Sequence, residues 1–157
     1  MKLQEEFEGL FGNKPDLISQ APGRVNLIGE HIDYNNGLVL PFAIDSVARC
    51  AIRVRNDSKI RLASKQITGP LIECEISRLS EKNEPLWTRY ILGVLWSLKI
   101  NSGIEILVDS NVPQGAGLSS SAALECSVAY VLNEAFSLGL SGKELALSAQ
   151  QIGRAHV

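Results

Sequence analysis

Charged and hydrogen-bonding side chains crowd against a short apolar segment at residues 24–37, which reads Arg-Val-Asn-Leu-Ile-Gly-Glu-His-Ile-Asp-Tyr-Asn-Asn-Gly. Its chemistry is carried by Arg24, Glu30, His31 and Asp33. A purely structural strand would alternate apolar and polar residues and then turn. A cluster of this kind is suited to binding a polyhydroxylated ligand.

Each of these residues also has an ordinary structural role open to it. Arg24 could pair with a surface carboxylate, Asn26 could stabilise a turn, and His31 could be a histidine with no ligand. Glu30 and Asp33 could be solvated. For each residue alone the structural role is the commoner one, but together, and with a second candidate site elsewhere, they favour binding.

The second candidate site is a glycine-rich segment at residues 112–123, Val-Pro-Gln-Gly-Ala-Gly-Leu-Ser-Ser-Ser-Ala-Ala. Glycines let the backbone approach a phosphate, and the free N–H groups and positive dipole end at a helix start attract the anion. The segment lacks the Gly-Lys-Ser/Thr ending of a Walker A loop, and Ser120 takes the third glycine position of a dinucleotide fingerprint. The alternative is a tight turn with Ser119 as a helix N-cap. The run of three serines favours phosphate, and two half-sites in one domain suggest a transferase.

The apolar pattern of the first half predicts one helix followed mainly by strands. Apolar residues recur at helical spacing over residues 3–11, and Gly12-Asn13 supplies a stop. Asn35-Asn36-Gly37 separates two apolar runs and predicts a hairpin, because Asn and Gly tolerate the positive φ of tight turns. Strands are predicted around residues 25–28, 38–44, 47–54 and 60–63.

The second half is predicted to be mainly helical. The spacing over residues 86–98 indicates an amphipathic helix that covers the sheet, with Pro85 near its first turn. A strand is expected at residues 104–109, and helical periodicity resumes at 122–136. Ser141 and Glu144 form the pattern of a capping box for a last helix.

Composition narrows the class of protein. The chain has 157 residues, 45% of them hydrophobic, which is enough for one soluble domain with a sizeable core. A net charge of −2 and scattered Lys and Arg argue against a nucleic-acid partner. We see no signal-peptide pattern and no long apolar stretch, so no membrane segment is expected and the cytoplasm is the expected location. Cys50, Cys74 and Cys126 lack Cys-x-x-Cys spacing and are expected to be buried thiols.

Residues 23–41 closely resemble the galactokinase signature, and residues 113–123 resemble the phosphate loop of the wider GHMP kinase superfamily. The resemblance extends from about Phe7 to Gln151. It implies an α+β fold, that of a GHMP kinase N-terminal domain, with a mixed sheet and helices packed on one side. It also implies that ATP, with Mg²⁺, phosphorylates the anomeric hydroxyl of galactose, in a protein expected to be a monomer.

The resemblance assigns roles to the first cluster. Glu30, His31 and Asp33 match the positions that hydrogen-bond the sugar hydroxyls, since carboxylates accept and an imidazole donates or accepts. Arg24 matches the transition-state arginine, whose guanidinium would neutralise developing negative charge and help activate the attacking hydroxyl. Ile32 replaces the usual threonine of the signature, and only a small effect is expected.

The resemblance also assigns the nucleotide site. The residues that match the ATP phosphate loop are Gly115, Ala116, Gly117, Leu118, Ser119, Ser120 and Ser121. Ser121 matches the serine that ligates magnesium, an ion that prefers hard oxygen ligands. Ser64 is expected near the nucleotide.

The chain departs from the family pattern after Gln151. Galactokinases continue there into a segment with a magnesium-binding glutamate and, further on, the aspartate that acts as catalytic base. Here residues 152–157 read Ile-Gly-Arg-Ala-His-Val, with Gly153 about where the glutamate is expected. These six residues also match the translation of a common sequencing adapter, so we expect a truncated domain at 1–151 and a non-native tail at 152–157. Without the base, this chain is expected to be inactive by itself. Without the C-terminal half that would pack on this domain, it is also expected to expose apolar surface.

Two other functions fit parts of the sequence. Another GHMP small-molecule kinase would share the serine-rich loop but would not carry Glu30-His31-x-Asp33. A non-enzymatic galactose sensor would keep sugar and ATP binding, typically with a damaged phosphate loop, whereas residues 119–123 are intact. A purely structural domain would require both motifs to be coincidental.

Overall fold

The computed structural model describes residues 2–29, 32, 35, 37–79 and 85–155. Its centre is a five-stranded mixed sheet with strand order β1-β2-β5-β3-β4. Neighbouring strands are antiparallel except β3 and β5, which are parallel. The strands are β1 Leu17–Ile28, β2 Leu40–Val54, β3 Lys59–Ser64, β4 Ile72–Glu75 and β5 Ile104–Ser110. The α-helices are α1 Lys2–Phe11, α2 Leu86–Ser97, α3 Ser120–Ala135 and α4 Gly142–Ala155, with a 3-10 turn, η2, at Ile76–Arg78.

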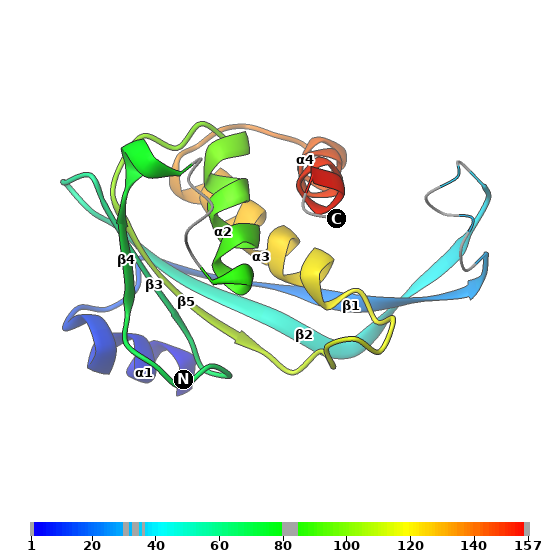
Figure 1. Ribbon diagram of the computed structural model, residues 1–157, viewed down its shortest axis with the longest axis horizontal. Helices are drawn as coiled ribbons and strands as arrows, with labels where there is room; N and C mark the ends of the chain where they lie inside the picture. Colours follow the sequence, from blue (N-terminus) through cyan, green and yellow to red (C-terminus); the bar gives the residue numbers. More distant parts are fainter. Residues whose placement is uncertain (1, 30–31, 33–34, 36, 80–84, 156–157) are drawn as a thin grey trace.

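The sheet is covered on both faces, as Figure 1 shows. Helices α2, α3 and α4 cover one face with the main core, which includes Ile52, Leu62 and Ile106 from the sheet. The predicted α+β class and its mixed sheet are confirmed. The expectation that the helices pack on one side holds for α2–α4 but not for α1, which buries Phe7 against Leu107 on the opposite face. Period-3.6 spacing shows that a helix buries one side, but it does not say which face of a sheet receives it.

Strands β1 and β2 form a long antiparallel hairpin, as predicted. Their pairing ends at Ile28↔Leu40, so an eleven-residue connection, 29–39, joins them. Asn36 lies outside the described residues. β5 pairs only with the second half of β2, from Ala48 onward, and the rest of the hairpin projects as a two-stranded arm (Figure 1).

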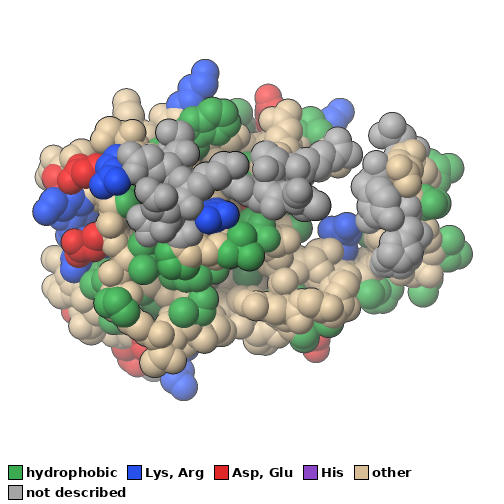
Figure 2. Space-filling model, viewed as in Figure 1, with side chains coloured by type: hydrophobic (Ala, Val, Ile, Leu, Met, Phe, Trp, Pro, Cys, Tyr) green, Lys and Arg blue, Asp and Glu red, His purple; other side chains and the backbone are tan. Residues whose placement is uncertain are grey.

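The arm carries exposed apolar side chains, which Figure 2 shows as green patches around its outer part. They are Leu27, Ile28, Leu38, Leu40 and Phe42. A contiguous exposed apolar surface commonly marks a contact with other protein. The exposed apolar surface expected from the sequence is therefore present in this part of the chain.

The last helix begins at the predicted capping box. The Ser141 N–H donates to Glu144 Oε2 at 2.8 Å, and the Glu144 N–H donates to Ser141 Oγ at 3.4 Å. α4 then continues across the expected boundary at 151/152, and Ile152 is buried in the main core. The helix therefore shows no break at that boundary, and the division into 1–151 and a tail stays a prediction.

A buried carboxylate ties the three inner strands β2, β5 and β3 together on the α1 side of the sheet. Glu105 of β5 is 1% exposed and accepts hydrogen bonds from three arginines. Arg53 Nε lies 2.9 Å from Oε2, while Arg55 Nη1 and Arg61 Nη1 lie 2.6 and 3.0 Å from Oε1. Burying an unpaired charge is costly, and these three contacts offset the cost of burying the Glu105 carboxylate.

Candidate active site

The glycine-rich segment forms the connection between β5 and α3, as predicted. Gly115 and Gly117 both have φ of +71°, and Ser119 has φ of +58°. The glycines adopt this left-handed backbone with little cost, and the alternation of conformations folds the segment into a compact loop. The residues from Gly115 to Gly117 are exposed, so the outer side of the loop is open to a ligand.

Ser119 occupies the N-cap position of α3, but its side chain makes no capping hydrogen bond. The first N–H groups of a helix have no partner within the helix, and a side-chain cap is their usual substitute. Here that substitute is missing, and Ser120 and Ser121 follow directly in the first turn of the helix. The start of α3 is thus a helix N-terminus suited to binding an anion, and the alternative of Ser119 as a side-chain cap is not observed.

The phosphate loop is seated on strand β1 beside Arg24. The Arg24 backbone N–H donates to the Leu118 carbonyl oxygen at 3.1 Å. On its inner side the loop is anchored by Val112, which packs with Ala48 of β2 and Ala123 of α3. The structure therefore brings together two motifs that the sequence predicted separately.

The Arg24 side chain acts electrostatically on α3. Burial and the negative charge of Glu125 raise the pKa of the Cys126 thiol, whereas the positive charge of Arg24 lowers it. Arg24 is partly buried at this place. The Arg24 guanidinium is therefore close enough to α3 to act on Cys126, and its role at the phosphate loop stays a prediction.

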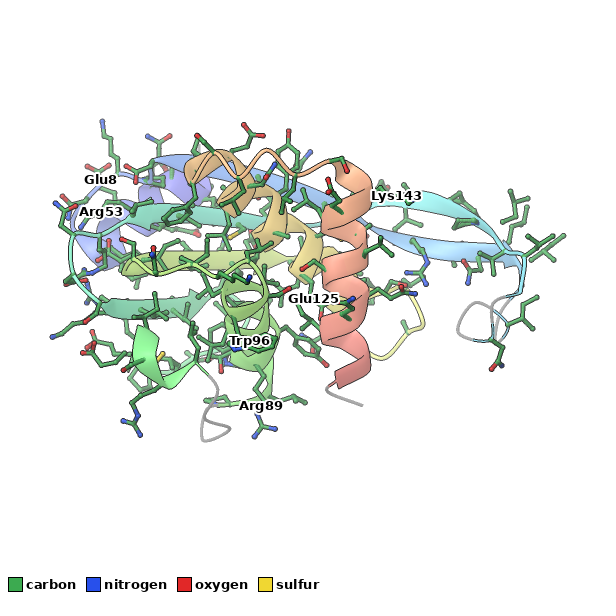
Figure 3. All side chains as sticks on the ribbon, turned by 90° about the horizontal axis from the view of Figure 1, so that it is seen from above. Glu8, Arg53, Arg89, Trp96, Glu125 and Lys143 are labelled. Carbon is green, nitrogen blue, oxygen red and sulfur yellow. The ribbon has the colours of Figure 1, made fainter. Side chains whose placement is uncertain are left out.

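Glu125 is a buried acid that the sequence interpretation did not single out. It is 2% exposed, its Oε1 has no hydrogen-bond partner, and burial raises its pKa from 4.5 to about 7. Figure 3 shows it where α3 meets α4. It follows Ser121 by four residues, so both lie on one face of α3. The sequence does contain a sign of this buried acid, because Glu125 lies within the helical apolar pattern of residues 122–136.

Ser64 ends β3 and is paired in register with Val108 of the parallel strand β5. Because side chains alternate along a strand, Ser64 shares the face of Leu62 and Val108, which the helices cover. The phosphate loop leaves the sheet from the same end of β5. The role of Ser64 near a nucleotide stays a prediction.

The residues expected to bind the sugar hydroxyls, Glu30, His31 and Asp33, lie outside the described residues. In sequence they fall within residues 29–39, which connect β1 and β2. There the Ile32 N–H donates to the Gly29 carbonyl oxygen at 3.2 Å, and the Gly37 N–H donates to the Ile32 carbonyl oxygen at 2.8 Å. The roles of the three residues remain predictions.

Within the described part of the chain, no group of three His, Cys, Asp or Glu side chains could hold a metal ion. Ser121 offers one exposed hydroxyl in the first turn of α3. Mg²⁺ commonly keeps several waters and binds substrate phosphates together with few protein ligands. A single hydroxyl beside a phosphate loop fits such an ion and does not fit a metal held by protein alone.

No helix among the described residues is long and apolar enough to cross a membrane.

Comparisons with known proteins match both motifs. The model described as "Galactokinase galactose-binding signature" matches residues 5–54, and the model "GHMP kinases N terminal domain" matches residues 89–157. A galactokinase of Streptomyces coelicolor is 43% identical over 157 residues, covering 98% of this chain and 41% of the relative.

Solved structures agree with the sequence comparisons. The Lactococcus lactis galactokinase complexed with galactose superimposes with a TM-score of 0.89 at 35% identity, over 99% of this chain and 42% of that chain. The mevalonate kinase of Methanococcus jannaschii has a TM-score of 0.72 at 21% identity, over 87% of this chain and 45% of that chain, and so shares the fold alone. The chain spans about two fifths of the length of the galactokinases it matches. Residues 5–54 thus match a galactokinase signature and residues 89–157 match the N-terminal domain of GHMP kinases, and nearly the whole chain is similar to galactokinases.

Proposed function

We propose that this chain forms the sugar-binding and phosphate-binding part of a galactokinase, which transfers the γ-phosphoryl group of ATP to the anomeric hydroxyl of galactose. The observation that carries the proposal is the backbone contact between Arg24 and Leu118, which joins the galactose-binding signature to the phosphate loop. The activity belongs to a protein longer than this chain, because the chain spans about two fifths of its relatives.

The phosphate loop supplies positioning. Backbone N–H groups at the start of α3, uncapped by Ser119, would bind phosphate oxygens, and the positive end of the helix dipole would favour their charge. Ser121 would ligate Mg²⁺, which when bound neutralises charge on the phosphates. Gly115 and Gly117 allow the loop backbone to approach the phosphates closely because they carry no side chain.

Arg24 acts between the two substrates. Its backbone is fixed to the loop through Leu118, and a guanidinium there would stabilise the negative charge that develops during transfer. Glu30, His31 and Asp33 would hold the sugar by hydrogen bonds to its hydroxyls, and thereby orient the attacking oxygen. Ser64 would lie near the nucleotide. The magnesium-binding glutamate and the catalytic base of the family would come from outside residues 1–151.

A second candidate is a non-enzymatic galactose and ATP sensor. The intact glycine and serine geometry of the loop favours the kinase. A cytoplasmic location and a monomeric state stay predictions from the sequence.

A hybrid enzyme separates the two candidates. In it, residues 1–151 of this chain replace the matching part of the Streptomyces coelicolor galactokinase, and ADP release is followed with galactose and ATP. A kinase gives continuous galactose-dependent turnover, which Arg24→Ala reduces by on the order of 100-fold or more. Galactose and ATP binding without turnover would instead support the sensor.

A further inference from the structure

One residue controls how closely the phosphate loop approaches strand β1. Gly23 comes directly before Arg24, at an irregularity in the β1–β2 register between Pro22 and Arg24. A Cβ placed at Gly23 would lie 2.8 Å from the Leu118 carbonyl oxygen. That oxygen is the acceptor of the Arg24 N–H, so the close approach at Gly23 and the hydrogen bond at Arg24 share one atom.

The space beside Gly23 is closed on its other sides as well. The same Cβ would lie 3.0 Å from Ile44 Cδ1 and 3.0 Å from Val112 Cγ1. These two atoms are the ends of side chains, which a small substitution can remove. The Leu118 oxygen belongs to the backbone and can move only if the loop moves.

The loop has little freedom to retreat locally. Leu118 is flanked by Gly117 at φ +71° and Ser119 at φ +58°, both in the left-handed region. Ser119 also accepts the first helical hydrogen bond of α3, from the Ala123 N–H at 3.0 Å. Displacing the Leu118 carbonyl would therefore move the phosphate loop and the start of α3 relative to Arg24.

We propose that Gly23 is a positioning residue for phosphoryl transfer, because its lack of a side chain allows Leu118 to seat on β1 and so sets the separation between Arg24 and the phosphate loop. This inference rests on the proposed function. A methyl group at residue 23 pushes the Leu118 carbonyl outward and lengthens its bond to the Arg24 N–H. The substrates still bind, but the guanidinium and the phosphates no longer have the geometry that transfer requires.

The kinetic test is Gly23→Ala in the hybrid enzyme. The expected result is a fall in kcat of on the order of 10- to 100-fold, with the KM values for ATP and galactose changed by less than about threefold. Gly9→Ala is the matched control, because a Cβ at Gly9 meets nothing within 4 Å, and it should leave kcat unchanged. Unchanged kcat in Gly23→Ala would overturn the inference.

A second variant separates positioning from side-chain packing and keeps the test valid if Gly23→Ala folds poorly. Ile44→Val and Val112→Ala together remove the two side-chain atoms near residue 23, so the backbone carbonyl of Leu118 is the close contact that remains. Adding Gly23→Ala to this background should still lower kcat at least about tenfold relative to the background. If the background and the background with Gly23→Ala had equal kcat, only side-chain crowding would matter, and the inference would be overturned.

Amide hydrogen exchange in the full 157-residue chain tests the same contact without activity. In Gly23→Ala the Arg24 amide should exchange at least about tenfold faster than in the parent, while it should be unchanged in Gly9→Ala. Equal protection of Arg24 would overturn the inference whatever the enzyme does. An inactive hybrid with Gly23 intact contradicts the proposed function instead, and the exchange result then decides the inference.

Discussion

Replacing the buried carboxyl of Glu125 by an amide should make the protein's stability less dependent on pH. The pKa of Glu125 is raised by burial from 4.5 to about 7 in the folded chain. A raised carboxyl pKa means that the folded state binds the proton more tightly than the unfolded state. The free energy of unfolding therefore falls as the pH rises from about 4.5 to about 7, and Glu125→Gln removes this dependence.

The two pKa values set the size of the effect. With a folded pKa of about 7 and an unfolded pKa of 4.5, ionisation of Glu125 destabilises the fold by about 1 kcal/mol at pH 5 and about 3 kcal/mol at pH 8. The difference between these two pH values is about 2 kcal/mol. Between pH 5 and pH 8, the free energy of unfolding of Glu125→Gln should thus rise by up to about 2 kcal/mol relative to that of the wild type.

Urea denaturation of the chain, followed by the fluorescence of Trp87 and Trp96, measures this difference at several pH values. The comparison with Glu125→Gln isolates one group, since every other titrating residue is common to both proteins. Glu134→Gln, an exposed acid on the same helix, is the matched control and should follow the wild type. Parallel stability curves for the wild type and Glu125→Gln would refute the assignment of a raised pKa to Glu125.

Three further outcomes follow from the contacts. Glu105→Gln removes the buried charge that three arginines share, and it should lower the free energy of unfolding in urea by on the order of 3–5 kcal/mol. Glu73→Gln, which removes the exposed partner of Arg61, should lower it by less than about 1 kcal/mol, and equal losses would show that burial of Glu105 does not matter. Ser141→Ala removes the capping box of α4 and should lower the free energy of unfolding by about 1 kcal/mol. The first amides of α4 should then exchange their hydrogens faster, and unchanged exchange would show that the cap is dispensable. In the hybrid enzyme, Ser121→Ala should raise the Mg²⁺ concentration for half-maximal activity by on the order of tenfold, while an unchanged magnesium dependence would remove Ser121 from the metal site.

Local patterns in the sequence were sufficient for the elements that local chemistry defines. The capping box of Ser141 and Glu144 and the helix that follows Pro85 needed only neighbours within a few residues, and both are confirmed. The phosphate loop belongs to the same group, since its glycines and serines specify a strand-to-helix connection by themselves. β4 was missed because it is only four residues long and lies at the sheet edge.

Long-range packing could not be predicted in the same way. No local pattern indicates that Leu118 accepts a hydrogen bond from Arg24, because β1 and the loop are far apart in sequence. Glu125 is buried on α3, and a helical period alone does not show which polar residue long-range packing covers. The Asn35-Asn36-Gly37 signal correctly predicted that the chain reverses between β1 and β2, but it could not show that the strand pairing ends as far away as Ile28 and Leu40.

The most direct test of the central claim is the identity of the product formed by the hybrid enzyme. We expect galactose and ATP to yield galactose phosphorylated at the anomeric oxygen, detected by phosphorus NMR, and we expect Asp33→Asn to reduce this product sharply. Phosphorylation of a different oxygen or of a different small molecule in preference to galactose, or no phosphoryl transfer at all, would contradict it.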